Sequence, residues 1–145
     1  MLRSFGHGAL GVVTLACVLT GGGWTAPATA AAQECGAQAN QLELTACANE
    51  AFAEADDRLN RTYRSIVGRL DGDAPRLESL RKAQRAWIAF RDAECVFATS
   101  GTVGGSAHPM IDADCRRRLT LQRAEALETY LHCQEGDLSC SVPLR

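Results

Sequence analysis

Apolar side chains recur at steps of three and four over a first long stretch of the chain, from Asn40 to Leu70. This spacing places them on one stripe, which is typical of an amphipathic α-helix. The run Asp71-Gly72-Asp73 is expected to end the helix. The residues expected to face the core are Ala48, Phe52, Ala55, Leu59, Tyr63, Ile66 and Leu70.

A second stripe begins after start signals at Asp73 and Pro75 and continues to about Phe97. Strong helix formers surround it, which favours a second helix. The residues expected to face the core here are Leu77, Leu80, Ala83, Trp87, Phe90 and either Val96 or Phe97.

The segment from Thr99 to Pro109 is rich in glycine, serine and threonine and is expected to form an exposed loop. Asp112 can cap a third helix that runs to about Leu131. Its expected buried residues are Leu119, Leu127, Tyr130 and Leu131. A short polar tail, 132–145, follows. No stretch alternates with period two, so the expected fold is all-α: a small three-helix bundle.

The first thirty residues have the composition of a signal peptide. Arg3 precedes an apolar run, residues 9–19, that is too short to span a bilayer permanently. Small side chains then favour cleavage between Ala30 and Gln33. We therefore expect a signal peptide over residues 1–30 and one helical domain over residues 31–145, placed in the periplasm or secreted.

A second processing route starts from Leu15-Ala16-Cys17, which loosely resembles a lipobox. Acylation of Cys17 would anchor the protein to the envelope through a flexible tether. Only this route predicts contact with a membrane.

The net charge of the chain adds little to these predictions. The chain has 15 basic and 17 acidic side chains, and loss of Arg3 leaves 14 against 17, a net charge of −3. This mildly acidic balance argues against a nucleic-acid partner.

Seven cysteines are more than a reduced domain of this size ordinarily holds, and they indicate an oxidising compartment. Cys17 is absent from a chain cleaved after Ala30 and acylated in a lipoprotein, which leaves six. Sequential pairing is favoured because each pair then brackets a short turn or loop. The expected disulfides are Cys35–Cys47, Cys95–Cys115 and Cys133–Cys140.

The cysteines and histidines of the chain indicate neither a catalytic site nor a metal site. There is no C-x-x-C pair, and His108 and His132 are the histidines left after cleavage, so no metal or cofactor is expected. No Ser-His-Asp or Cys-His arrangement is indicated either, so the protein is not expected to be an enzyme.

Polar residues at helical spacing predict a cluster between the helices. Those on the first helix share one face, as do those on the second, and a third helix can add an arginine. The favoured interpretation is a buried network that fixes helix register, and the alternative is a groove that binds an anionic or carbonyl-rich group. We call these residues the polar cluster: Asp56, Asn60, Tyr63, Gln84, Trp87, Arg91 and Arg123.

Three motifs carry a resemblance that covers nearly all of the chain after residue 30. They are Glu43-Leu-Thr-Ala-Cys47, Gln84-Arg-Ala-Trp87 and Arg91-Asp-x-Glu-Cys95. In these residues the chain resembles the LprI-like lysozyme inhibitor domain family of bacteria. The resemblance implies a helical, disulfide-bonded envelope domain and, for its namesake member, inhibition of lysozyme. Cys133 and Cys140 are additions to the family's core pattern.

The loop is the candidate contact region for another protein, because a Cys95–Cys115 disulfide would clamp its ends. Lysozyme presents a cleft with two catalytic carboxyls. Hydrogen-bond donors from Gly104, Gly105, Ser106 and His108 would suit that cleft, whereas a solvated connector is the plainer interpretation of the glycines. The alternative function is an envelope protein that binds another envelope protein or peptidoglycan fragments without inhibiting lysozyme.

Overall fold

The computed structural model describes residues 40–134 and 136–143. Over these residues no β-strand occurs, and the all-α three-helix fold is confirmed. The expected signal peptide, the lipobox and Cys35 lie outside the described part of the chain. In order, the elements are α1 (Gln41–Arg69), α2 (Ala74–Ala98), the short 3-10 helix η1 (Ser100–Thr102) and α3 (His108–Leu131).

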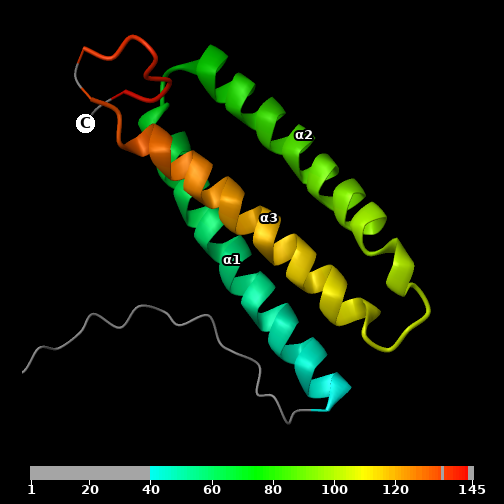
Figure 1. Cartoon of the computed structure of the whole chain (residues 1–145). Helices are drawn as coiled ribbons and strands as arrows, with labels where there is room; N and C mark the ends of the chain where they lie inside the picture. The colour runs from blue at the N-terminus through cyan, green and yellow to red at the C-terminus, as the bar shows by residue number, and fades with distance from the viewer. Residues whose placement is uncertain (1–39, 135, 144–145) are drawn as a thin grey trace, which may run out of the picture.

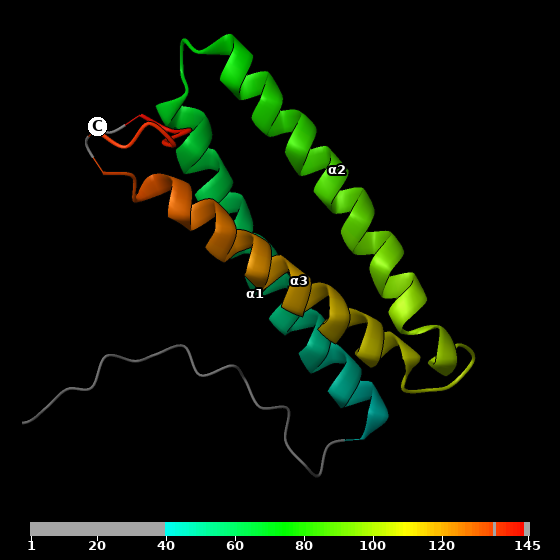
Figure 2. The same cartoon turned by 45° about the horizontal axis from the view of Figure 1, so that its top comes forward.

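Helices α1 and α3 lie side by side along most of their length, whereas α2 runs beside α3 and stands further from α1 (Figures 1 and 2). The hydrophobic core lies toward the end of the bundle where α1 and α3 finish. It contains residues from both helices and one from the C-terminal tail: Leu59, Ile66, Leu70, Ala124, Leu127 and Val142.

Helix α1 begins with a capping box. The Asn40 side chain accepts hydrogen bonds from the N–H groups of Leu42 and Glu43, and the Glu43 carboxylate accepts one from the N–H of Asn40. Most of the expected stripe is buried, with Phe52 and Tyr63 partly buried. The helix ends as expected before Gly72, whose φ of 85° suits a residue without a Cβ.

Helix α2 corrects the prediction of which face is buried. Leu77, Leu80 and Trp87 do pack against the core. The buried positions are instead Gln84, Arg91 and Cys95. Because long polar side chains fill the space between α2 and the other helices, most of the predicted apolar stripe from Ala83 onward faces solvent. The residues wrongly expected in the core are Ala83, Phe90, Val96 and Phe97.

Helix α3 starts at His108, four residues before the expected cap at Asp112. Asp112 instead pairs with Arg116 one turn later, at 2.7 Å. Leu127 is fully buried as predicted, whereas Tyr130 is 38% exposed. The loop is consequently shorter than predicted, since His108 and Pro109 belong to the first turn of α3.

Two of the three expected disulfides are confirmed, Cys95–Cys115 and Cys133–Cys140. Cys47 is also disulfide-bonded, but its pairing with Cys35 remains a prediction. Among the described helices, none combines the length and apolar character that crossing a bilayer requires.

Candidate functional site

Arg91 is the centre of the polar cluster. Its guanidinium lies over the rings of Phe52 and Trp87, at 5.3 and 5.2 Å from their centroids. One nitrogen lies 3.7 Å from the Asp56 carboxylate, and another donates to Asp92 at 3.0 Å. Arg91 is buried, so these aromatic and anionic neighbours replace the water that a charged group needs.

Two further contacts extend the polar cluster. Asn60 donates to Asp56 at 2.8 Å, and Arg123 donates to the amide oxygen of Gln84 at 3.1 Å, which joins α3 to α2. Tyr63 instead packs against the hydrophobic core. The structure therefore brings the predicted residues together in three groups, with Arg91 as the link between α1 and α2.

A second ionic group extends from Arg91 along α3. Asp92 also accepts a hydrogen bond from Arg116 at 2.8 Å, and Arg116 in turn bonds Asp112 at 2.7 Å. The hydrogen bond that Arg116 donates to Asp112 raises the pKa of Arg116, and the charges of Asp112 and Asp92 raise it further. Arg91 and Arg116 have anionic partners, whereas Arg123 bonds the neutral amide of Gln84. The polar contacts of the cluster are thus made largely among its own residues and their neighbours.

The segment between α2 and α3 is held in one conformation by its own hydrogen bonds. The Thr99 hydroxyl donates to the carbonyl of Cys95 at 2.7 Å, and the Thr102 hydroxyl donates to the carbonyl of Thr99 at 2.7 Å. Since the single proton of Thr102 is used there, the His108 Nδ1 atom must donate to its oxygen, at 2.9 Å. The Cys95–Cys115 disulfide ties the helices on both sides of this segment.

Glycine is favoured at two positions of the loop. Gly104 has φ of 83°, in the region that favours glycine. At Gly105 a Cβ would lie 3.1 Å from the carbonyl oxygen of Thr102, which is tighter than ordinary contacts. The N–H of Gly105 donates to that same oxygen at 3.0 Å. Gly105 is thus not the free donor that the sequence suggested.

Other donors in the loop are free. Within the described residues, the N–H groups of Gly104, Ser106 and Ala107 have no intramolecular acceptor, and neither has the Ser106 hydroxyl. The loop leads into the N-terminus of α3, which has no side-chain cap and no acidic residue in its first turn. The positive end of the helix dipole therefore lies beside a group of unsatisfied donors, an environment that favours an anion or a carbonyl oxygen.

Exposed apolar side chains flank these donors. Phe97 in the last turn of α2 is 76% exposed and Val103 in the loop is 70% exposed. Phe97 was expected in the core as an alternative to Val96, and Val103 lies within the loop that was predicted as a contact region, but neither was predicted as an exposed apolar contact residue. Isolated exposed apolar residues are ordinary, so Phe97 and Val103 are candidate contact residues only in combination with the free donors of the loop. We call Phe97, Val103, Gly104, Ser106 and His108 the loop-end surface.

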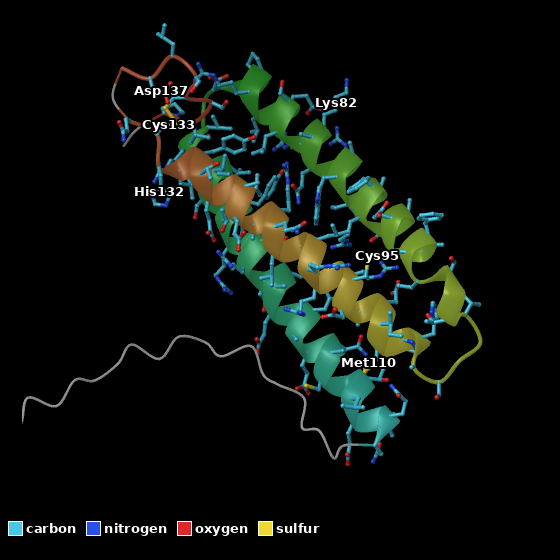
Figure 3. All side chains as sticks on the ribbon, viewed as in Figure 1. Lys82, Cys95, Met110, His132, Cys133 and Asp137 are labelled. Atoms are coloured by element: carbon cyan, nitrogen blue, oxygen red, sulfur yellow. A yellow bond between two sulfur atoms is a disulfide. The ribbon has the colours of Figure 1, made fainter. Side chains whose placement is uncertain are left out.

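The loop-end surface lies at the end of the bundle where α3 starts, beside the beginning of α1 (Figure 1). The amide of Gln41 lies 3.8 Å from the sulfur of Met110, which joins the first turns of α1 and α3. Figure 3 shows Met110 at this end, with Cys133 and Asp137 at the opposite end. In the described residues, no group of three or more His, Cys, Asp or Glu side chains is arranged to hold a metal ion.

Comparison with known proteins places this fold in a family. A relative from Rhizobium meliloti (strain 1021), "Uncharacterized protein R02472", is 38% identical over 125 residues, which cover 77% of this chain and 90% of the relative. No solved structure matches the chain. The family described as "Lysozyme inhibitor LprI" matches residues 31–127. The chain therefore belongs to the LprI lysozyme inhibitor family.

Proposed function

We propose that this protein binds and inhibits a lysozyme-type muramidase by inserting the loop-end surface into the active-site cleft of the enzyme. The observation that carries the proposal is the set of free donors at Gly104, Ser106 and Ala107 beside the uncapped start of α3. Family membership supports the same function.

The chemistry of the two surfaces is complementary. Muramidases of this kind act with two carboxyl groups in a cleft. Backbone N–H groups and the Ser106 hydroxyl can donate to those carboxyls, and the dipole of α3 adds favourable electrostatics. Such contacts occupy the carboxyl groups that act on the substrate, so binding of this protein would by itself inhibit the enzyme.

The loop is also organised for binding. Its hydrogen bonds through Thr99, Thr102 and His108 and the clamp by Cys95–Cys115 reduce the conformational entropy lost in a complex. Phe97 offers the exposed aromatic ring that often dominates binding energy at the centre of an interface.

The proposed setting follows from the sequence. An enzyme that cleaves peptidoglycan is met outside the cytoplasm, so the proposal requires export by the expected signal peptide over residues 1–30. Free secretion or release into the periplasm is proposed first, and anchoring through an acylated Cys17 is the alternative.

One observation favours a second candidate function, a contact with another envelope protein. Phe90 is 54% exposed and Val96 is 64% exposed on α2, outside the loop. A non-inhibitory protein that binds a partner through the whole length of α2 would use these residues and leave the loop in solvent.

Loop variants separate the two functions. Val103→Asp and the double variant Ser106→Ala/His108→Ala should each weaken lysozyme inhibition by at least about tenfold, because they alter the inserted surface. Leu138→Asp is the matched control, since Leu138 is fully exposed and follows Asp137, which lies at the opposite end of the bundle (Figure 3). Inhibition that is insensitive to the loop variants, or is lost equally in the control, would contradict loop insertion.

Competition gives a second readout. A soluble chitin trisaccharide that fills the lysozyme cleft should reduce the affinity of the inhibitor in proportion to its occupancy. Binding that is indifferent to the trisaccharide, together with sensitivity to Phe90→Ala and Val96→Ala, would favour the contact through α2.

A further inference from the structure

A pocket lies between the last turns of α1, the first half of α2 and the C-terminal tail. These elements meet at the end of the bundle away from the loop (Figure 2). Its volume is about 530 Å³. This lies within the range of about 300 to 1,000 Å³ that is usual for small-molecule sites. The buried floor includes Ile66, Leu70 and Val142, and Leu80 and Ala83 of α2 form one wall.

The opposite wall consists of the tail residues 138–142. The Cys133–Cys140 disulfide holds this segment close to the end of α3 (Figure 3). Val142 is only 2% exposed and belongs to the hydrophobic core, so the tail is anchored at both ends of the wall. The pocket is thus a built part of the fold, and the two added cysteines help to form it.

Some of the polar groups that line the pocket are donors without acceptors, whereas the hydroxyls of Ser79 and Ser139 donate to neighbouring oxygens. Within the described residues, neither the Tyr130 hydroxyl nor the Ser141 hydroxyl makes an intramolecular hydrogen bond, and the backbone N–H of Ser141 has no acceptor. The guanidinium of Arg76 makes one contact, to Asp73 at 3.4 Å, and remains 53% exposed. A guanidinium has five N–H donors, so one contact leaves most of the hydrogen-bonding capacity of Arg76 unused.

We propose that this pocket binds a single-chain anionic amphiphile, with its apolar chain against Leu80, Ala83 and Val142 and its carboxylate at Arg76 and Tyr130. An apolar floor matches the chain, and a cation with neighbouring hydroxyl donors matches the head group. The site is independent of the proposed inhibition of lysozyme, because it lies at the other end of the bundle.

Isothermal titration calorimetry of the oxidised chain, residues 31–145, with decanoate below its micelle concentration tests the proposal. We expect one decanoate per chain. Ala83→Trp should abolish binding because the indole fills the pocket, whereas Ala93→Trp, on the exposed side of the same helix, should not change it. Arg76→Gln should weaken decanoate binding at least about tenfold, and Arg81→Gln, an exposed arginine on the same helix, should leave it unchanged.

Decanol and hexanoate complete the test. Decanol should bind more weakly than decanoate and should not respond to Arg76→Gln, and hexanoate should bind weakly because its chain is short. Absence of saturable decanoate binding, binding that survives Ala83→Trp, or equal affinity for decanol would overturn the proposal. Val103→Asp should bind decanoate normally, so a failure of lysozyme inhibition would be distinguished from a failure of this site.

Discussion

Arg91 and Asp56 join α2 to α1 through an ion pair at 3.7 Å, although the aromatic rings of Phe52 and Trp87 cover the arginine. The side chain of Arg91 is 11% exposed and that of Asp56 is 42% exposed. The arginine is therefore desolvated while its partner still touches water. The attachment of α2 thus combines this buried cation with the apolar contacts of Leu77, Leu80 and Trp87 and with the Cys95–Cys115 disulfide.

Replacing Arg91 should destabilise the domain strongly. We expect Arg91→Met to lower the free energy of unfolding by about 2 kcal/mol, because Asp56, Asp92 and the aromatic rings lose their shared partner. Arg91→Lys should restore only part of the lost free energy of unfolding, since lysine lacks the planar guanidinium group of arginine. Urea unfolding monitored by circular dichroism measures both. Arg85→Met, at an exposed position on the same helix, should change stability by less than about 0.5 kcal/mol, and an equal loss there would contradict this role.

The disulfide that clamps the loop should matter more for stability than the one in the tail. Cys95–Cys115 closes 20 residues and is buried, so its removal by a double alanine variant should cost roughly 3 kcal/mol. Cys133–Cys140 closes 7 residues, and its removal should cost roughly 2 kcal/mol. Thermal unfolding of the two double variants compares them directly. The opposite order would show that the tail, not the loop, is the main constraint.

Loop glycines offer a test of loop conformation. Gly104→Ala should cost about 1 kcal/mol of stability, since alanine is strained at φ of 83°. Gly105→Ala should move the loop because its Cβ meets the Thr102 carbonyl. Both variants should inhibit lysozyme less well.

Gly101→Ala is the matched control for the loop glycines. No atom lies within 4 Å of the Cβ position at Gly101, so its replacement should leave stability and inhibition near the parent values. Equal behaviour of all three alanine variants would show that the loop conformation does not matter.

Acid should weaken the contact between α1 and α3. Arg58 donates to both oxygens of Glu128, at 2.9 and 2.7 Å, and this hydrogen bonding lowers the pKa of Glu128 below its ordinary value. A lowered folded pKa means that the pair stabilises the protein above the unfolded pKa and that this contribution is lost as the pH falls through the folded pKa.

Glu128→Gln isolates that contribution. Because both side chains are about one-third exposed, the variant should lose less than about 1 kcal/mol at neutral pH. The difference in the free energy of unfolding between the variant and the parent should become smaller as the pH is lowered to about 3, near the ordinary range of carboxyl pKa values. Urea midpoints at the two pH values measure this, and a deficit that does not depend on pH would contradict the account.

The sequence predicted the helices well and the site less well, for physical reasons. Periodic apolar positions identify a helix and its apolar face, and on α1 that face is the buried one. On α2 the same periodicity predicted the wrong buried face, because Gln84 and Arg91 face inward and Phe97 faces solvent. Periodicity cannot report which face another helix covers. Which N–H groups of the loop are free to bind a partner depends on the backbone hydrogen bonds within the loop. The N–H of Gly105, for example, donates to the carbonyl of Thr102, and residue types do not specify such bonds.

Inhibition of a muramidase is the proposed function of this protein. Its most direct test is a cell-wall lysis assay in which the oxidised, folded domain is titrated from nanomolar to micromolar concentration against c-type and g-type lysozymes. The account predicts a stoichiometric loss of activity with at least one class. Full activity of both classes, in the presence of a domain shown to be folded and fully disulfide-bonded, would contradict it.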